Sequence, residues 1–331
     1  MCKNTEKSVN LLIMKGRIRV LCLLALALSC GTRGNKAAQT PALRDFPMAD
    51  VPTMMTEPLE RAVWLAQHFW DRFTDPQKLY TCDSLTVNGV SLEPLESQVG
   101  LFASLLQQIP LPEGEKAMVN AFRRLSAFQE AQPQGNVFSE TSALISRYFF
   151  DPNSPVRSED LYLPFVTLLA SSPLTPEDLR PGYAWDVKTC QMNRTGTPAA
   201  DFTFVDTAGR RRTLHGIKAE WTLLIFGNPD CGACRELMKA MQESAEISAL
   251  LGQGRLQVVD VYIDQDIALW KEHVQDYPAR WINGYDPTFS IRGDRLYAVR
   301  ALPSLYLLDR DKTVVLKDAP EQTVLEVLAR L

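Results

Sequence analysis

The stretch of sequence that is most informative about the fold is Phe226-Gly-Asn-Pro-Asp-Cys231-Gly-Ala-Cys234-Arg-Glu-Leu237. This stretch follows a short apolar segment at 222–226, a predicted buried strand, and leads into a predicted helix at 236–251. A Cys-x-x-Cys pair in this position is typical of a redox site. The unpaired N–H groups and the positive end of a helix favour a thiolate at Cys231, and Cys234, one turn later, can resolve a mixed disulfide.

The segments around this pair predict an α/β domain after residue 195. They are a β-hairpin turning at 206–209, a strand at 256–263, a helix at 267–277, a second hairpin turning at 309–312, and a last helix opened by the capping-box pattern Asp318-x-x-Glu321. The strand–helix–strand order implies a parallel core, to which the late hairpin adds antiparallel strands.

The preceding half of the chain predicts helices alone. Apolar residues recur at helical spacing in segments punctuated by prolines. The predicted helices lie at 59–73, 95–109, 116–128, 142–150 and 161–169, with a further start at Thr175-Pro176. We therefore predict an all-α domain over 54–193 and an α/β domain over 194–331.

The N-terminal segment predicts export. Basic residues precede the apolar run 20–29, which is too short to cross a bilayer, so we interpret residues 1–29 as a signal peptide. The run ends at Cys30 in a pattern that resembles a bacterial lipobox, which implies lipidation of Cys30; ordinary cleavage is the alternative. Residues 30–53 then predict a linker. The expected location is a bacterial envelope membrane, with the protein lipid-anchored and facing the periplasm.

Composition excludes several classes of protein. The 331 residues are 46% hydrophobic and 22% charged with a net charge of −4, which is ordinary for a globular chain and unfavourable for binding nucleic acid. The five cysteines that follow the predicted signal peptide are too few for a disulfide scaffold in a chain of this length. We predict that Cys82 and Cys190 are small buried side chains, with a disulfide between them as the alternative.

Other uses of the Cys-x-x-Cys pair are less favoured. Zinc requires four ligands, whereas no second Cys-x-x-Cys or Cys-x-x-His occurs, and His215 and His273 are isolated. A purely structural disulfide remains an alternative. A peroxidase is disfavoured because the sequence has no Pro-x-x-x-Thr-x-x-Cys element. We expect neither a metal nor another cofactor.

Residues 196–331 resemble the thioredoxin fold, in particular the periplasmic thiol–disulfide oxidoreductases of the TlpA/ResA type. Gly196-Thr-Pro-Ala-Ala-Asp-Phe202 is similar to their leading hairpin, and Cys231-Gly-Ala-Cys234 to their active site. Ala301-Leu-Pro-Ser-Leu-Tyr-Leu-Leu-Asp309 is similar to the segment that holds their cis-proline. The resemblance implies that Pro303 is cis and belongs to the catalytic site, and that Leu302 faces the cysteines. The small Gly232 and Ala233 leave room for a protein or peptide substrate.

The resemblance extends into the predicted helical domain. Motifs at 68–73 and 148–157 are similar to those of thioredoxin-like lipoproteins of Gram-negative gut bacteria, which carry an N-terminal domain of unknown function. This implies a membrane-tethered oxidoreductase that acts on protein or peptide disulfides and depends on an upstream thiol reductant. Reductase, oxidase and isomerase remain open. The alternative is a binding or scaffold lipoprotein with idle cysteines.

The sequence departs from thioredoxin at two points. Asp230 and the pair Gly232-Ala233 stand where thioredoxins have Trp and Gly-Pro, and Ile225 stands where they have a buried acid, six residues before the first cysteine. A substitute proton acceptor is predicted at Asp260 or Glu236. The alternative for each is a solvated or capping carboxylate.

Overall fold

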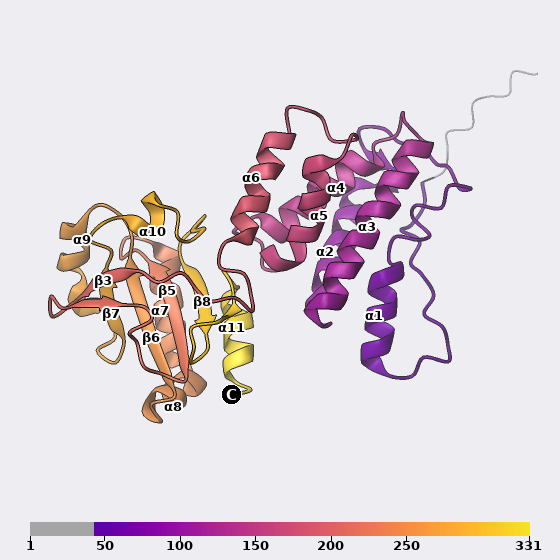
Figure 1. Ribbon diagram of the computed structural model, residues 1–331. Helices are drawn as coiled ribbons and strands as arrows, with labels where there is room; N and C mark the ends of the chain where they lie inside the picture. The colour runs from indigo at the N-terminus through magenta and orange to yellow at the C-terminus, as the bar shows by residue number, and fades with distance from the viewer. Residues whose placement is uncertain (1–42) are drawn as a thin grey trace, which may run out of the picture. The chain divides into compact units, whose positions relative to one another are not determined.

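A computed structural model describes residues 43–331 (Figure 1). The predicted signal peptide, Cys30 and the first part of the predicted linker lie outside the described residues. The described residues form a helical domain followed by a domain with a mixed sheet. The predicted fold class, an all-α domain followed by an α/β thioredoxin fold, is confirmed. None of the helices in 43–331 is long and apolar enough to span a membrane.

Helices account for most of the first domain. They are α1 (Pro58–His68), α2 (Leu92–Leu106), α3 (Leu111–Ala131), α4 (Val137–Phe150), α5 (Glu159–Ser171) and α6 (Arg180–Gln191). Prolines stand in the first turns of α1, α3 and α6, where the missing N–H has no cost. The hydroxyl of Ser158 caps α5 by accepting the N–H of Leu161.

Two details of this domain differ from the prediction. The last helix begins at Arg180, because Thr175–Leu179 form a turn in which the N–H of Leu179 donates to the carbonyl of Pro176 at 3.1 Å. The domain also contains a small hairpin, β1 (Thr86–Val87) and β2 (Val90–Ser91). It turns at Asn88-Gly89, and both residues have positive φ, which this dipeptide adopts readily.

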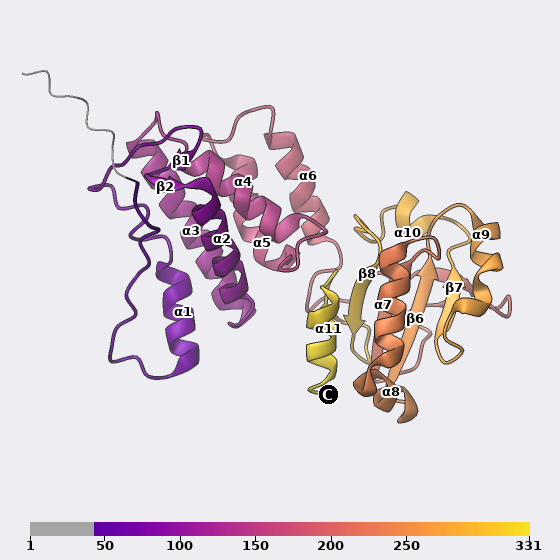
Figure 2. The same ribbon diagram turned by 180° about the vertical axis from the view of Figure 1, so that it is seen from behind.

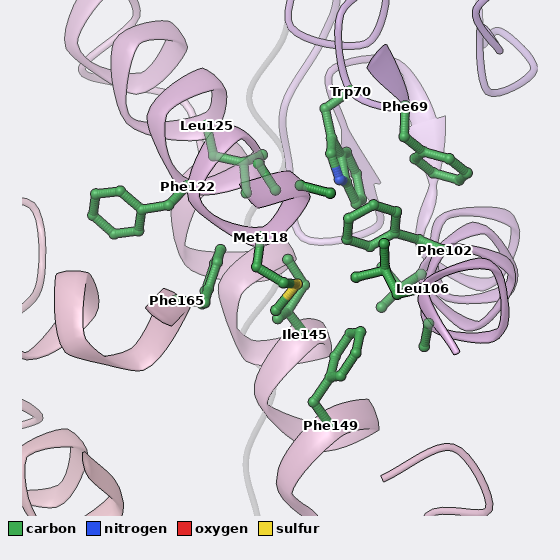
Figure 3. Packing of buried hydrophobic residues seen from close by; sticks show 14 of the residues in the cluster. Phe69, Trp70, Phe102, Leu106, Met118, Phe122, Leu125, Ile145, Phe149 and Phe165 are labelled. Atoms are coloured by element: carbon green, nitrogen blue, oxygen red, sulfur yellow. The ribbon is translucent and has the colours of Figure 1, made fainter. Parts of the chain in front are cut away.

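An aromatic core holds the helical domain together. Phe102 of α2 is fully buried, and its ring lies 5.0 Å from Phe69, 5.5 Å from Trp70 and 6.5 Å from Phe149 between ring centroids. Figure 3 shows these rings converging from α2, α4 and the end of α1. The periodic apolar positions of the sequence therefore face one shared core.

Part of the predicted linker 30–53 packs on the helical domain. Phe46 stacks on Phe73 with ring centroids 5.1 Å apart, and Arg44 donates to the carbonyl of Asn88 at 2.9 Å. An aromatic side chain inserted into a hydrophobic core stabilises the segment that carries it. Residues 43–48 thus belong to the helical domain, although their composition is that of a linker.

The second domain is built on a seven-stranded sheet with the order β4-β3-β7-β6-β5-β8-β9. The strands are β3 (Thr203–Asp206), β4 (Arg211–Thr213), β5 (Trp221–Gly227), β6 (Leu256–Tyr262), β7 (Ile282–Tyr285), β8 (Ser304–Leu308) and β9 (Val314–Leu316). β5, β6 and β7 run parallel, and the other pairings are antiparallel.

Helices cover the sheet. They are α7 (Gly232–Glu243), α8 (Ala245–Gly252), α9 (Ile267–Glu272), α10 (Ser290–Gly293) and α11 (Glu321–Leu328). A hydrophobic cluster joins α7, α8 and α11 to one face of the sheet, and Figure 2 shows α7 lying over this face. A separate cluster on the opposite face includes residues of β3, β5, β6 and α10.

Three sequence predictions for this domain are corrected. The predicted helix at 236–251 is two helices, because Ser244 ends α7 and caps α8 by accepting the N–H of Ile247 at 3.2 Å. Strand β7 was not predicted. The capping box of the last helix does not form either: Pro320 precedes α11, and the Asp318 side chain is buried and accepts from the hydroxyl of Ser304 at 2.7 Å.

The burial of Phe102 predicts a large effect of truncation. Phe102→Ala should lower the free energy of unfolding by about 3–5 kcal/mol, because it leaves a cavity between packed rings. Its neighbour Leu101, which is 48% exposed, provides the control, and Leu101→Ala should change this free energy by less than about 1 kcal/mol. Urea unfolding followed by circular dichroism measures both, and equal losses would contradict the assigned core.

Candidate functional site

The two cysteines lie at the junction of β5 and α7. β5 ends at Gly227, and Cys231 is the residue directly before α7, with extended backbone angles. Its Sγ accepts a hydrogen bond from the backbone N–H of Cys234 at 3.2 Å. The sulfur thus occupies the position of a helix cap, where free N–H groups and the helix dipole favour negative charge. Both cysteines are free and half-buried.

The loop before β8 forms the opposite wall of the site. The Leu302–Pro303 peptide bond is cis, as the resemblance implies. The Sγ–H of Cys231 donates to the carbonyl oxygen of Leu302 at 3.6 Å. β8 pairs with β5 and sets Ser304 opposite Phe226, so the loop lies beside the end of β5. Leu302 therefore faces Cys231, as predicted.

The approach to Cys231 is lined by small side chains. Gly232 and Ala233, between the cysteines, are both exposed. Asp230 is also exposed, and its backbone N–H donates to the side-chain oxygen of Asn228 at 2.9 Å. A partner that reaches Cys231 therefore meets little steric hindrance from this loop.

Asp260 is the buried acid of the site. In the parallel pairing of β5 and β6, Asp260 stands beside Ile225, the residue at the position where thioredoxins have their buried acid. Asp260 therefore lies on the strand next to that position. Gly227 leaves space for it: a β-carbon there would lie 3.2 Å from Asp260 Oδ1. Burial raises the pKa of Asp260 to about 7. Its Oδ1 has no hydrogen-bond partner among the described residues.

A small cavity connects this acid to the second cysteine. Its volume is about 40 Å³, and Asp260, Cys234 and Tyr277 are among the residues that line it. A water molecule fits in such a space and needs polar partners, which these side chains provide. The other predicted proton acceptor, Glu236, is exposed on α7 and does not line the cavity. The geometry therefore favours Asp260.

Cys234 requires a proton acceptor. Burial, followed by its hydrogen bond with Cys231, raises the pKa of the Cys234 thiol well above its ordinary value. Cys234 is therefore protonated at neutral pH and must lose its proton before it attacks a disulfide.

Sequence analysis did not single out Tyr277. Burial, and then the charge of Asp260, raises the pKa of this phenol, so it stays neutral beside the acid. In the sequence it marks only the end of a predicted helix, and nothing in the local pattern distinguishes it. His273 also lines the cavity, and its Nδ1 lies 2.8 Å from Asp276 Oδ2.

The remaining described cysteines lie apart from the site. Cys190 is buried at the end of α6, where burial raises the pKa of its thiol well above the ordinary range. Cys82 is half-buried in the helical domain, and its Sγ accepts from the N–H of Asn88 at 3.3 Å. Both thiols are free, so the alternative of a disulfide between them is wrong for this structure. Among residues 43–331, no group of three His, Cys, Asp or Glu side chains could hold a metal.

Comparison with a solved structure decides the family. A thioredoxin-like protein from Bacteroides caccae is 31% identical, with a TM-score of 0.74 over 87% of this chain and 99% of the other. The chain belongs to the family of thioredoxin-like proteins. Residues 29–180 match the family model described as a domain of unknown function, DUF5106.

A second relative is similar over a shorter stretch. The thiol–disulfide oxidoreductase ResA of Bacillus cereus is 27% identical over 128 residues, which is 39% of this chain and 71% of the relative. The shared fold and this relative support a redox role. The description of DUF5106 names no activity for the helical domain.

The raised pKa of Asp260 predicts a pH-dependent stability. In the unfolded chain this carboxyl ionises near pH 4, whereas burial delays its ionisation to about pH 7 in the fold. Ionisation of the Asp260 carboxyl therefore lowers the free energy of unfolding as pH rises from about 4 to 7. Asp260→Asn should remove this loss and raise the free energy of unfolding at pH 8 by on the order of 2–4 kcal/mol.

The matched control is Glu236→Gln, which changes the exposed candidate acid on α7. It should leave the stability curve unchanged. Burial also raises the pKa values of Asp186 and Asp318 to about 6. Their contribution to the pH dependence of stability is the same in wild type, Asp260→Asn and Glu236→Gln. Urea unfolding between pH 4 and 8 measures the difference. Parallel curves for wild type and Asp260→Asn would contradict the assignment.

Proposed function

We propose that the protein is a thiol–disulfide oxidoreductase that acts on protein or peptide disulfides through Cys231 and Cys234. The observation that carries this proposal is the placement of Cys231 Sγ. It caps α7 at 3.2 Å from the N–H of Cys234 and lies 3.6 Å from the carbonyl of Leu302. A sulfur at a helix start and a facing peptide group are what disulfide exchange with an extended substrate requires.

In the first step, Cys231 attacks the substrate. Its thiolate forms a bond with one sulfur of the substrate disulfide, and the other substrate sulfur leaves as a thiolate that takes up a proton from water. The helix N-terminus stabilises the thiolate before attack. Leu302 offers its backbone to the substrate peptide as a short antiparallel pair, and Gly232 and Ala233 leave space for it.

In the second step, Cys234 releases the product. Asp260 accepts the proton of the Cys234 thiol through water in the cavity that both side chains line. The Cys234 thiolate then attacks Cys231 Sγ, which closes the Cys231–Cys234 disulfide and expels the second substrate thiolate. A carboxylate with a pKa of about 7 is matched to this transfer, because it can accept and return a proton near neutral pH.

The cycle closes with a thiol reductant. Two electrons from an upstream dithiol return the Cys231–Cys234 disulfide to two thiols, and the reductant becomes the disulfide. The same steps run in reverse in an oxidase, so the direction depends on the reduction potentials of the partners. The cycle involves no cofactor.

The N-terminal sequence supports a proposal for location. The basic residues before 20–29 and the cysteine at its end support export and lipidation at Cys30. A lipid there would hold the protein at a bacterial envelope membrane with the redox site in the periplasm, where disulfide substrates occur. The anchoring membrane would be the outer or the inner membrane. The redox site would then take part in the redox homeostasis of the bacterial envelope.

The two cysteines have different expected mutant phenotypes. Cys234→Ala should stop turnover and accumulate a mixed disulfide between Cys231 and the substrate, because nothing resolves it. Cys231→Ala should abolish both turnover and the mixed disulfide. Mass spectrometry after reaction with a peptide disulfide identifies the adduct, and dithiothreitol supplies the electrons for turnover.

The matched control is Cys82→Ala, which removes a thiol of the helical domain and should retain turnover. The competing function is a binding or scaffold protein with idle cysteines. Wild-type protein that does not reduce peptide disulfides, together with a Cys234→Ala variant that forms no adduct, would favour that alternative and overturn the proposal.

The lipid anchor predicts a modified N-terminus. Mature protein isolated from bacterial membranes should begin at Cys30 and carry the mass of attached acyl chains. Cys30→Ser should move the protein from the membrane to the soluble fraction, because a covalent lipid is the expected attachment. A mature chain that begins beyond residue 30 would contradict this prediction.

A further inference from the structure

A cluster of buried charges links the helical domain to the loop of the redox site. The Arg300 cluster consists of Arg157 and Glu159 from the helical domain and Arg300, Lys317 and Asp318 from the sheet domain. Glu159 and Lys317 have side chains only 2% and 1% exposed. The redox mechanism described above does not use any of them.

Arg300 is the centre of this cluster. Its guanidinium binds Glu159 Oε1 with Nη2 at 2.8 Å and contacts Asp318 Oδ2 at 3.4 Å. It also donates to the backbone carbonyl of Phe150 and lies 4.0 Å from the centroid of the Phe150 ring. A planar guanidinium bound on several sides has one orientation, which lysine could not reproduce.

Asp318 ties the other end of the loop to the same cluster. Its Oδ1 accepts from the hydroxyl of Ser304 at 2.7 Å. Its backbone carbonyl accepts from Arg157 Nε at 2.8 Å. Arg157 comes from the segment between α4 and α5, so this end also depends on the helical domain.

Glu159 is held in place by a second cation. Lys317 Nζ lies 2.7 Å from Glu159 Oε2 and donates to the carbonyls of Thr189 and Cys190 at the end of α6. The carboxylate therefore has cations at both oxygens, as a buried charge needs. Glu159 is also the first residue of α5, where the helix dipole favours an acid.

Arg300 and Ser304, which the cluster binds, flank the Leu302–Pro303 peptide. Arg300 lies two residues before Leu302, and Ser304 follows Pro303 directly. Between these two attached points the chain presents the Leu302 carbonyl to Cys231 Sγ. The contacts of Glu159 and Arg157 therefore reach both flanks of that carbonyl, directly at Arg300 and through Asp318 at Ser304.

We propose that the helical domain positions the Leu302–Pro303 loop for extended substrates, with Glu159 as the positioning residue that acts through Arg300. This inference rests on the proposed function. It assigns the domain a role in substrate alignment at the redox site. A small disulfide that reaches Cys231 without pairing with Leu302 would not need this alignment.

The test compares two substrates in the full chain. With dithiothreitol as reductant, Glu159→Gln should raise the KM for an extended peptide disulfide about fivefold, equivalent to one weakened peptide hydrogen bond. Its kcat should stay within about twofold, as should the rate at which the pre-reduced protein, freed of dithiothreitol, reacts with the small disulfide dithiobis-nitrobenzoate. General damage to the fold would lower both activities together.

A second variant, Arg300→Lys, tests the same inference if Glu159→Gln does not fold. Glu159→Gln leaves Lys317 and Arg300 short of a counter-charge, which can destabilise the fold. Arg300→Lys keeps the charge but loses the fork that reaches Phe150, Glu159 and Asp318. It should produce the same rise in KM for the peptide substrate alone.

The matched control is Asp206→Asn. Asp206 is a buried carboxylate bound by Arg210 and Arg212, but it lies on β3, separated from β5 by β6 and β7. Its substitution should not change the ratio of the two activities. An unchanged ratio in both Glu159→Gln and Arg300→Lys, or an equal change in Asp206→Asn, would overturn the inference. Wild type inactive on both substrates would instead overturn the proposed function.

Discussion

The parallel pairing of β5 with β6 is the constraint on which the site depends. It places Ile225 beside Asp260 and Gly227 beside Tyr262, so the chain leaves β5 directly next to a buried acid. The turn after β5 then leads into α7, which brings Cys231 to the helix start and Cys234 above the same acid. The pairing of β5 with β6 thus brings the start of α7 and the buried proton acceptor next to each other.

Local patterns were sufficient to predict the parts of the site that are local. The apolar strand, the two cysteines and the helix that follows lie in one stretch, and Pro303 was found by resemblance. The choice between Asp260 and Glu236 needed the fold, because burial is a tertiary property. A signal was present: Asp260 interrupts an apolar strand, whereas Glu236 stands on a helix face that is exposed.

Other features could not be predicted because partners distant in sequence determine them. β7 is only four residues long and includes Asn283-Gly284, yet β3 and β6 pair with it on both sides. Asp318 matches a capping box, but Ser304 and the arginines of the cluster hold it instead. Phe46 lies in a segment with the composition of a linker, and only the aromatic core explains its place.

The chemistry of the Arg300 cluster has a consequence for mechanical precision. Apolar surfaces attract each other without direction, so two domains joined by them can slide with little change in energy. A guanidinium fork and a buried carboxylate bind only along fixed directions, and misalignment leaves a charge without a partner. A junction built from Glu159, Arg300 and Asp318 therefore fixes the position of the two domains relative to the loop. It resists their displacement far more than it adds to the free energy of folding.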